Sequence, residues 1–164
     1  MYIIKNLLGL ITLTMLSMSL QAQPISTTMT KADKEQVINA FYDAWDSGNR
    51  EKYEQVIARD LIDHDRNPMV KASDFDGMWG LVQSLQGLDM KHNIQQIHFL
   101  ENNKVMVRWN ASAKHVGDFF GMPASNKTAY YAGHDIFQLN GKGQITEIWH
   151  IEQIFQLMQQ LKPQ

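Results

Sequence analysis

The stretch that decides the fold is Thr128–Leu161, TAYYAGHDIFQLNGKGQITEIWHIEQIFQLMQQL. It contains two runs with the alternating pattern of strands, 128–139 and 144–151, and then a helix-like segment over 152–161. Between the runs, the sequence Asn-Gly-Lys-Gly is typical of a tight turn, because Asn and Gly tolerate the positive φ angles that hairpins require. The stretch therefore predicts a β-hairpin followed by a helix.

Strand parity places one carboxylate and one imidazole on the same face of this hairpin. Side chains alternate between faces along a strand, so an even-length turn fixes which residues share a face. With Gly141 and Lys142 as the turn, His150 lies opposite Gly133 and diagonal to Asp135, roughly 7 Å away at the backbone. We therefore predict an Asp135–His150 pair. The opposite face is expected to carry Tyr130, His134, Ile136, Gln138, Ile145, Glu147 and Trp149.

Length and composition indicate one globular domain. A chain of 164 residues is long enough for one well-buried core and too short for two ordinary domains. The absence of cysteine excludes disulfides, thiol nucleophiles and thiolate metal sites. The formal net charge of −2 gives no indication of a nucleic-acid partner.

The N-terminus has the pattern of a secretory signal peptide. Lys5 precedes an apolar run over 7–20, and Gln21-Ala22-Gln23 follows it with a small residue at the expected cleavage point. The run is shorter than a membrane span needs, which disfavours a permanent anchor. We therefore predict a signal peptide over 1–22, a linker over 23–29, a domain over 30–164, and a periplasmic or secreted protein.

Helical periodicity predicts three helices before the first strand. Residues 31–47 follow a capping box that begins at Thr30, and Gly48 ends the run. Trp45, near the end of this helix, is either core or the wall of a pocket. Second and third helices are expected over 50–58 and, capped by Ser73, through Leu85.

Two further strands are predicted over 90–100 and 104–115. In the second strand the apolar face includes Trp109 and His115, which should point to the core. The pattern of the first strand does not fix its register. Residues 116–127 form a loop with unusually apolar side chains, which favours a lid over a pocket slightly above a loop packed on the core.

Residues 60–65, DLIDHD, place three carboxylates around His64. Such a cluster is either a functional site or a solvated turn, and the spacing alone favours the turn. Taken in order, three helices, four strands and a closing helix predict an α+β domain with helices on one face of an antiparallel sheet.

Four segments resemble the SnoaL-like polyketide cyclases, also called ester cyclases, of the nuclear transport factor two–like superfamily. They are FYDAWDSGN, DLIDHD, VRWNASAKHVGDFFGMPASNK and GHDIFQLNGKGQITEIWHIEQIFQLMQQL, and together they cover roughly 31–161. The resemblance implies a strongly curved sheet wrapped around helices, a cone with an internal pocket, no cofactor, and dimers formed through the outer sheet face. That face would carry Arg108, Asn110, His134, Ile136 and Trp149, whose exposed apolar groups fit a homodimer.

The resemblance also implies a catalytic position. In characterised cyclases an aspartate on the last strand is the general acid/base of an intramolecular aldol closure, and His150 occupies that position here. A second polar residue on the preceding strand falls at Asp135. Histidine can serve in this role because its ordinary pKa near 6.5 suits proton transfer at neutral pH.

Our main hypothesis is therefore an enzyme for a small apolar or carbonyl-containing molecule. His150, held by Asp135, would abstract a proton next to a carbonyl or activate water. Six further residues are candidates for contacting the substrate, by packing or by polarising an oxygen: Trp45, His64, Trp109, His115, Tyr131 and Phe137.

Two alternatives remain open at this point. A non-catalytic periplasmic protein that binds a small apolar ligand predicts the same pocket. A metal site built from His64, His115, Asp135 and His150 has no recognised motif spacing in its favour, and we expect none.

The predicted export can be tested directly. Protein recovered from the periplasm should begin at Gln23, because cleavage is expected after Ala22. N-terminal sequencing measures this, and an intact Met1 in a cytoplasmic fraction would contradict it.

Overall fold

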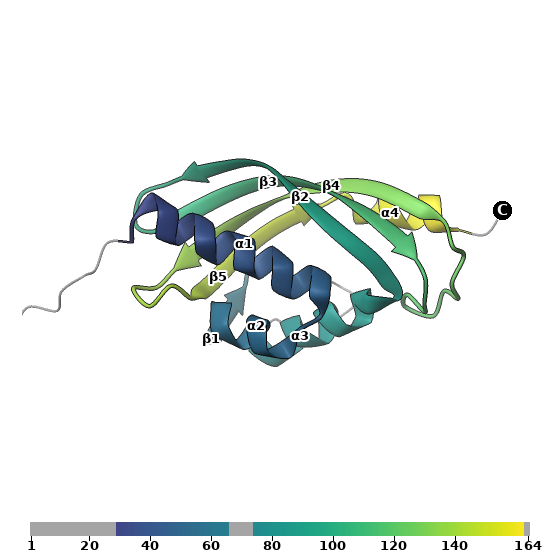
Figure 1. Cartoon of the computed structure of the whole chain (residues 1–164), viewed down its shortest axis with the longest axis horizontal. Coiled ribbons are helices and arrows are strands. Elements are labelled where there is room, and N and C mark those ends of the chain that lie inside the picture. The colour runs from purple at the N-terminus through teal and green to yellow at the C-terminus, as the bar shows by residue number, and fades with distance from the viewer. Residues whose placement is uncertain (1–28, 66–73, 163–164) are drawn as a thin grey trace, which may run out of the picture.

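The computed structural model describes residues 29–65 and 74–162. The predicted signal peptide and all but the last residue of the predicted linker lie outside these ranges. Within them, a curved sheet of five strands wraps around a long helix (Figure 1). The predicted α+β class and curved sheet are confirmed.

The first helix, α1 (Lys31–Ser47), begins and ends where the sequence predicts. The Thr30 hydroxyl accepts a hydrogen bond from the Asp33 backbone at 3.1 Å, and the Asp33 carboxylate accepts one from the Thr30 backbone at 3.0 Å. These bonds satisfy amides that a helix start leaves without partners. Gly48 ends the helix with φ +58°, the left-handed conformation that glycine adopts without strain.

The next two helices are shorter than predicted. Helix α2 (Arg50–Val56) ends two residues early, because the chain turns into a strand at Ile57. Helix α3 (Phe75–Ser84) is capped by Asp74 and not by Ser73, and a single 3₁₀ turn, η1 (Leu85–Gly87), follows it. The Asp74 carboxylate accepts a hydrogen bond from the Gly77 backbone at 2.9 Å, which fixes this start.

The four predicted strands are present, and a fifth was missed. Strands β2 (Leu88–Phe99), β3 (Lys104–His115), β4 (Thr128–Leu139) and β5 (Ile145–Glu152) form an antiparallel meander. Strand β1 (Ile57–Asp63) pairs in parallel with β5, which gives the order β1-β5-β4-β3-β2. Sequence reasoning read part of β1 as a solvated turn, because its inward positions include a carboxylate.

The β4–β5 hairpin reaches the predicted parity by a different register. Leu139 pairs with Ile145, so the loop spans five residues, and a bulge then brings Asp135 opposite His150. His150 therefore faces Asp135 directly, and Glu152 takes the place opposite Gly133. A loop with an odd number of residues reverses the predicted parity, and the bulge reverses it again. Asp135 and His150 therefore still share a face. The prediction that Ile145 points outward is wrong, since its side chain is buried.

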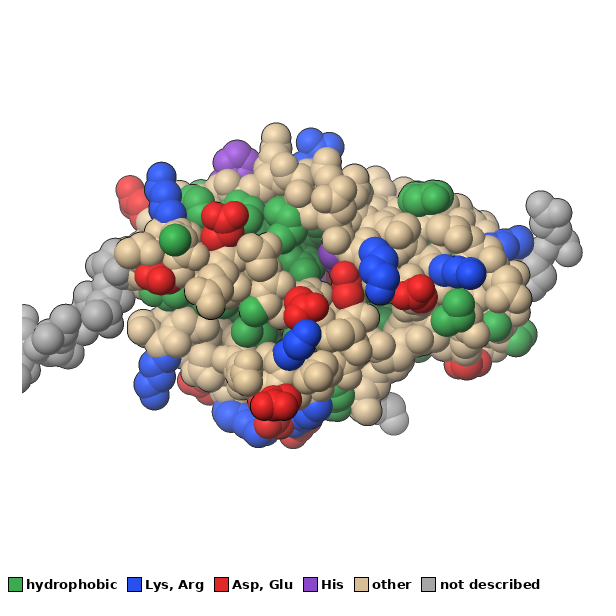
Figure 2. Space-filling view, viewed as in Figure 1, with side chains coloured by type: hydrophobic (Ala, Val, Ile, Leu, Met, Phe, Trp, Pro, Cys, Tyr) green, Lys and Arg blue, Asp and Glu red, His purple; other side chains and the backbone are tan. Residues whose placement is uncertain are grey.

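Helix α1 crosses the concave face of the sheet (Figure 1) and carries much of the core. Its buried apolar and aromatic side chains are Ile38, Phe41, Tyr42, Ala44 and Trp45. Figure 2 shows hydrophobic side chains in a hollow on the face across which α1 runs. Helix α4 (Ile154–Leu161) follows β5 and packs beside the first half of β4. The Gln153 and Gln160 side chains bond to the β4 backbone there, which satisfies this edge of the strand.

The loop over 116–127 packs on the core and is not the predicted lid. Phe119 is fully buried, and the backbone amides of Val116 and Gly117 both donate to the Gly87 carbonyl at 2.9 Å. The buried His115 ring lies 3.0 Å from the Ser125 hydroxyl and 3.2 Å from the Met122 carbonyl. The apolar residues that suggested a lid are therefore anchors of the loop.

The outer sheet face is solvent-facing, as the predicted dimer surface requires. Arg108, Asn110 and His134 are exposed, whereas Ile136 and Trp149 are half-buried. The homodimer stays a prediction.

Across the described part of the chain, no helix has the length and hydrophobicity to cross a membrane.

Gly133 provides a stability test of the core. A Cβ atom at this position would lie 2.3 Å from the Trp109 ring, so Gly133→Ala forces the indole to move. We expect a loss of about 1–3 kcal/mol in the free energy of unfolding, measured by urea denaturation. Gly80→Ala is the matched control. Gly80 lies in α3 with nothing within 4 Å of the added atom, so this change should stabilise by up to about 1 kcal/mol. Equal stabilities of the two variants would contradict the packing argument.

Candidate functional site

A small, partly enclosed cavity lies between α1, α3 and the concave face of the sheet, and its empty space is about 330 Å³ when the open solvent at its mouth is included. Its apolar wall consists of Phe41, Trp45, Met78, Leu81, Trp109 and Ile148. Its polar groups come from α1 and from three different strands, and they are Tyr42, His92, Asp135, His150 and Glu152. An apolar pocket with a few converging polar groups is the usual form of a small-molecule site.

Asp135 is a buried member of these polar groups, at 4% exposure. Its Oδ2 atom accepts hydrogen bonds from the Tyr42 hydroxyl of α1 and, at 2.7 Å, from the Trp109 indole N–H of β3. No described residue donates a hydrogen bond to Oδ1. The carboxylate is therefore held by one oxygen, and its other oxygen remains available to a ligand.

Burial and hydrogen bonding act in opposite directions on the Asp135 pKa. Burial raises it, the hydrogen bond from Tyr42 lowers it, and the net result is a pKa of about 6. The pKa of the Tyr42 hydroxyl is raised well above its ordinary value by burial and by the Asp135 charge. Tyr42 therefore keeps its proton and acts as a donor, while Asp135 titrates close to neutral pH.

His150 shares the cavity with Asp135 but takes different partners. Its Nε2 atom lies 3.1 Å from Asp63 Oδ1, and its Nδ1 atom lies 3.5 Å from Glu152 Oε1. The His150 backbone amide donates to the Asp65 carboxylate at 3.0 Å. Asp135 was expected within hydrogen-bond or one-water reach of His150. The structure pairs the two residues directly across β4 and β5 and places both in the cavity, but the imidazole bonds to Asp63 and not to Asp135. In the DLIDHD segment, Asp63 and Asp65 bond to His150, whereas His64 lies at the surface.

Two carboxylates keep the His150 imidazole protonated. Burial alone lowers its pKa, but the hydrogen bonds and charges of Asp63 and Glu152 outweigh burial and raise the pKa to about 10. The expected upward direction therefore occurs, through carboxylates other than the predicted one. A histidine in this state is a poor base at neutral pH and a good source of positive charge.

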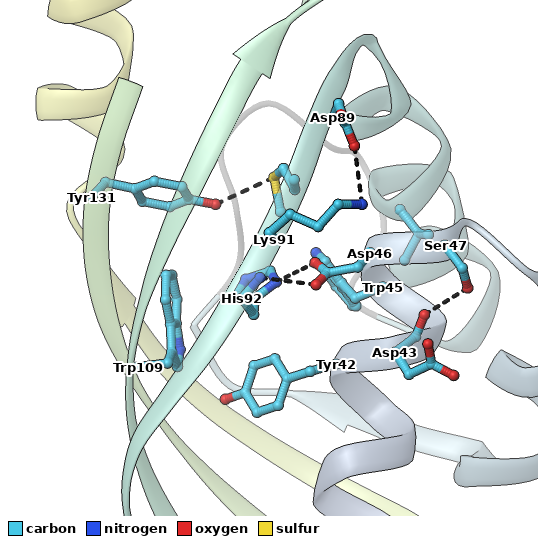
Figure 3. A network of polar contacts seen from close by, with 12 residues as sticks. Tyr42, Asp43, Trp45, Asp46, Ser47, Asp89, Lys91, His92, Trp109 and Tyr131 are labelled. Atoms are coloured by element: carbon cyan, nitrogen blue, oxygen red, sulfur yellow. Dashed lines mark hydrogen bonds and ion pairs between the residues drawn. The ribbon is translucent and has the colours of Figure 1, made fainter. Parts of the chain in front are cut away.

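A second imidazole, His92, was missed by sequence reasoning. Its Nδ1 atom lies 2.5 Å from Asp46 Oδ1, and its ring packs against Tyr42 and Trp109 (Figure 3). A bulge between Ile94 and Gln96 breaks the alternation of β2, but before the bulge His92 is in phase with the inward residues Leu88, Met90 and Ile94. The alternation over 88–94 was the signal that could have found it.

The other predicted site residues divide into three groups. Trp45 and Trp109 lie in the cavity wall. Tyr131 and Phe137 are buried one layer behind it, where Tyr131 packs against Trp109 and Phe137 against Phe41. His64 and His115 lie elsewhere, because Trp149 and Glu147 hold His64 at the surface and the 116–127 loop surrounds His115.

The four residues considered for a metal site do not converge. His64 and His115 are engaged away from the cavity that contains Asp135 and His150. Among the residues that the structure describes, no three His, Cys, Asp or Glu side chains form a group that could hold a metal ion.

Comparisons with known proteins agree with this architecture. A family model described as SnoaL-like polyketide cyclase matches residues 35–161. TsrD from Streptomyces laurentii has a TM-score of 0.69 at 21% identity, covering 82% of this chain and 98% of that chain. A search of the curated proteins found no match.

Two further solved structures carry a functional description. IdmH from Streptomyces antibioticus, described as a candidate polyketide cyclase, has a TM-score of 0.67 at 25% identity, covering 78% and 97%. AclR from Streptomyces galilaeus, described as a candidate hydroxylase, has a TM-score of 0.67 at 17% identity, covering 80% and 97%. The resemblance noted from the sequence is thereby confirmed.

The raised pKa of His150 predicts a specific pH dependence of stability. The folded protein holds this proton more tightly than the unfolded chain, whose histidine titrates near 6.5. The stabilisation is therefore fully present below about pH 6.5 and is lost as the pH rises through about 10. Urea denaturation across this window should show a steeper loss of the free energy of unfolding in the wild type than in His150→Gln.

The pKa itself can be measured directly. An NMR titration should place the His150 midpoint near 10, and Asp63→Asn should lower this midpoint. A midpoint near 6.5 in the wild type would contradict this assignment.

Proposed function

The chain belongs to the SnoaL-like polyketide cyclase family, and on this premise we propose that it is a cofactor-independent enzyme. The proposed reaction is proton removal from the carbon next to a carbonyl group of a small molecule. One observation carries the proposal above all others. A carboxylate with a raised pKa lies in an aromatic cavity beside a cationic imidazole.

Asp135 is the proposed base. A general base works best when its pKa lies near the working pH, and the pKa of about 6 meets this condition. Oδ1 takes the proton as the C–H bond breaks, and the electron pair moves to the carbonyl oxygen to give an enolate. The bonds from Tyr42 and Trp109 to Oδ2 keep the carboxylate oriented during this step.

His150 is the proposed electrostatic partner. Its positive charge favours the negative charge that develops on the enolate oxygen. The contact between Nδ1 and Glu152 is long, at 3.5 Å, so a substrate oxygen can compete for this N–H. The roles expected from the sequence are therefore exchanged in this proposal, with Asp135 as the base and His150 as the cation.

The enolate has two productive fates in such a cavity. Attack of its carbon on a second carbonyl of the same molecule forms a C–C bond and an alkoxide, which takes the proton back from Asp135. This ring closure is the reaction that the description of IdmH implies for that protein. Return of the proton to another carbon gives an isomerase. The same residues are also compatible with a related lyase or hydrolase reaction.

A non-catalytic protein that binds a small apolar ligand is the second candidate. The aromatic wall of Phe41, Trp45 and Trp109 would serve it equally well. A purely apolar ligand gives no reason to bury a carboxylate, which is costly without a polar role. The burial of Asp135 therefore favours the enzyme.

We further propose that the enzyme acts outside the cytoplasm as a homodimer. The signal-peptide pattern over 1–22 supports export. The exposed outer face of β3, β4 and β5 supports the dimer, with the half-buried Ile136 and Trp149 as its apolar elements.

The base is tested by hydrogen–deuterium exchange at carbon. Wild-type protein in D₂O should accelerate α-proton exchange of a small aryl ketone such as acetophenone, followed by NMR. Asp135→Asn keeps the shape of the side chain but removes the base, so we expect a loss of about 10²- to 10⁴-fold. His150→Gln should lose less, because it removes only the nearby charge.

Binding of the same ketone separates the two candidate functions. Trp45 and Trp109 line the cavity, so quenching of tryptophan fluorescence reports occupancy. Retained binding with lost exchange in Asp135→Asn supports the enzyme. Binding without any exchange in the wild type, over a panel of aryl ketones and diketones, would overturn the proposal in favour of the binding protein.

A further inference from the structure

We propose that His92, positioned by Asp46, is a proton relay between the buried cavity and solvent. Its catalytic consequence rests on the proposed function, but the relay itself can be tested without any substrate. The proposal stands on the tautomer of His92, on its neighbours, and on the two spaces that it separates.

Asp46 fixes the tautomer of His92. The ring is 4% exposed, its Nδ1 atom lies 2.5 Å from Asp46 Oδ1, and the His92 backbone amide donates to Asp46 Oδ2 at 2.8 Å. An ionised carboxylate only accepts hydrogen bonds, so Nδ1 carries the proton. Nε2 is then the atom that can accept a proton, and no described residue bonds to it.

The neighbours of His92 are the two side chains that hold Asp135. The His92 ring centroid lies 5.1 Å from that of Tyr42 and 4.8 Å from that of Trp109. Figure 3 shows the imidazole beside both rings. Tyr42 and Trp109 both donate to Asp135 Oδ2, so His92 lies next to the proposed base across a single layer of side chains.

His92 also lies at the boundary of two spaces. Together with Tyr42 it lines the inner cavity and an open groove on the outside, between α1 and β2. The groove is polar, with Asn39, Asp43, Asp46 and Asn93 among its lining residues. Asp46 is 17% exposed on this side. Among the described residues of the cavity, only Tyr42 and His92 also belong to this groove.

This arrangement supplies a path that His150 lacks. His150 is already protonated and cannot accept the proton that Asp135 takes from a substrate. Nε2 of His92 can accept it, while the Nδ1 proton passes to Asp46 and from there to water in the groove. The imidazole gains one proton as it loses another, so its charge is unchanged and the number of protons is conserved.

The first experiment uses the protein without any ligand. The Trp109 indole N–H is bonded to Asp135, and NMR measures its exchange with D₂O. His92→Gln is close in size and keeps a polar side chain, but its amide cannot take up one proton and release another. We expect the Trp109 exchange rate to fall severalfold, with the stability unchanged. His98→Gln, an exposed histidine on the same strand, is the control and should leave the rate at the wild-type value. An unchanged or faster rate in His92→Gln would overturn the relay.

The second experiment adds the reaction. His92→Ala should slow α-proton exchange of acetophenone, and free imidazole in solution should restore it through the space that the ring leaves. Imidazole should not rescue Asp135→Asn, because that variant lacks the base itself. Loss of exchange in His92→Ala without rescue would show a structural role and refute the relay. Absence of ketone exchange in the wild type would refute the proposed function alone, and the Trp109 measurement would still decide the relay.

Discussion

The buried carboxylate of Asp135 is the constraint on which the rest of the site depends. Removing a partner from a buried charge costs about 3–5 kcal/mol, so the fold must bring donors to it. Tyr42 arrives from α1 and Trp109 from β3, and the two bonds join the helix to the centre of the sheet. Gly133 leaves room for the Trp109 ring, because any side chain there would occupy the place of the indole. Packing and chemistry are therefore set by the same few contacts.

Charge is distributed around the cavity so that its three ionisable centres behave differently. Asp135 has two neutral donors and burial, which leave its pKa near 6. His150 has two carboxylates, which hold its proton to about pH 10. His92 has one carboxylate on Nδ1 and an open Nε2. A base, a cation and a second imidazole with one open nitrogen thus lie in one apolar space, and the differences follow from the number and sign of their partners.

The sequence predicts most helices and strands of this protein correctly, because local rules such as capping and alternation determine where they begin and end. The capping box at Thr30 and the glycine at position 48 define α1, and the alternation over 104–115 and 128–139 defines β3 and β4. The prediction fails at β1, where Asp63 occupies an inward position that a strand usually gives to an apolar residue. It also fails at β2, where the bulge interrupts the period after Ile94, so that the inner face of the whole strand was left unassigned.

What the sequence determined by itself is the helices, the four antiparallel strands and the shared face of Asp135 and His150, since these follow from periodicity over neighbouring residues. Only the tertiary structure decided which groups bond to them. Asp63 reaches His150 from 87 positions away in the chain, and Tyr42 reaches Asp135 from 93. Periodicity assigns a side chain to a face but not to a partner, because partners depend on bulges, on strand order and on the path of α1 across the sheet. Those are properties of the assembled fold, and they fix the protonation states on which the chemistry rests.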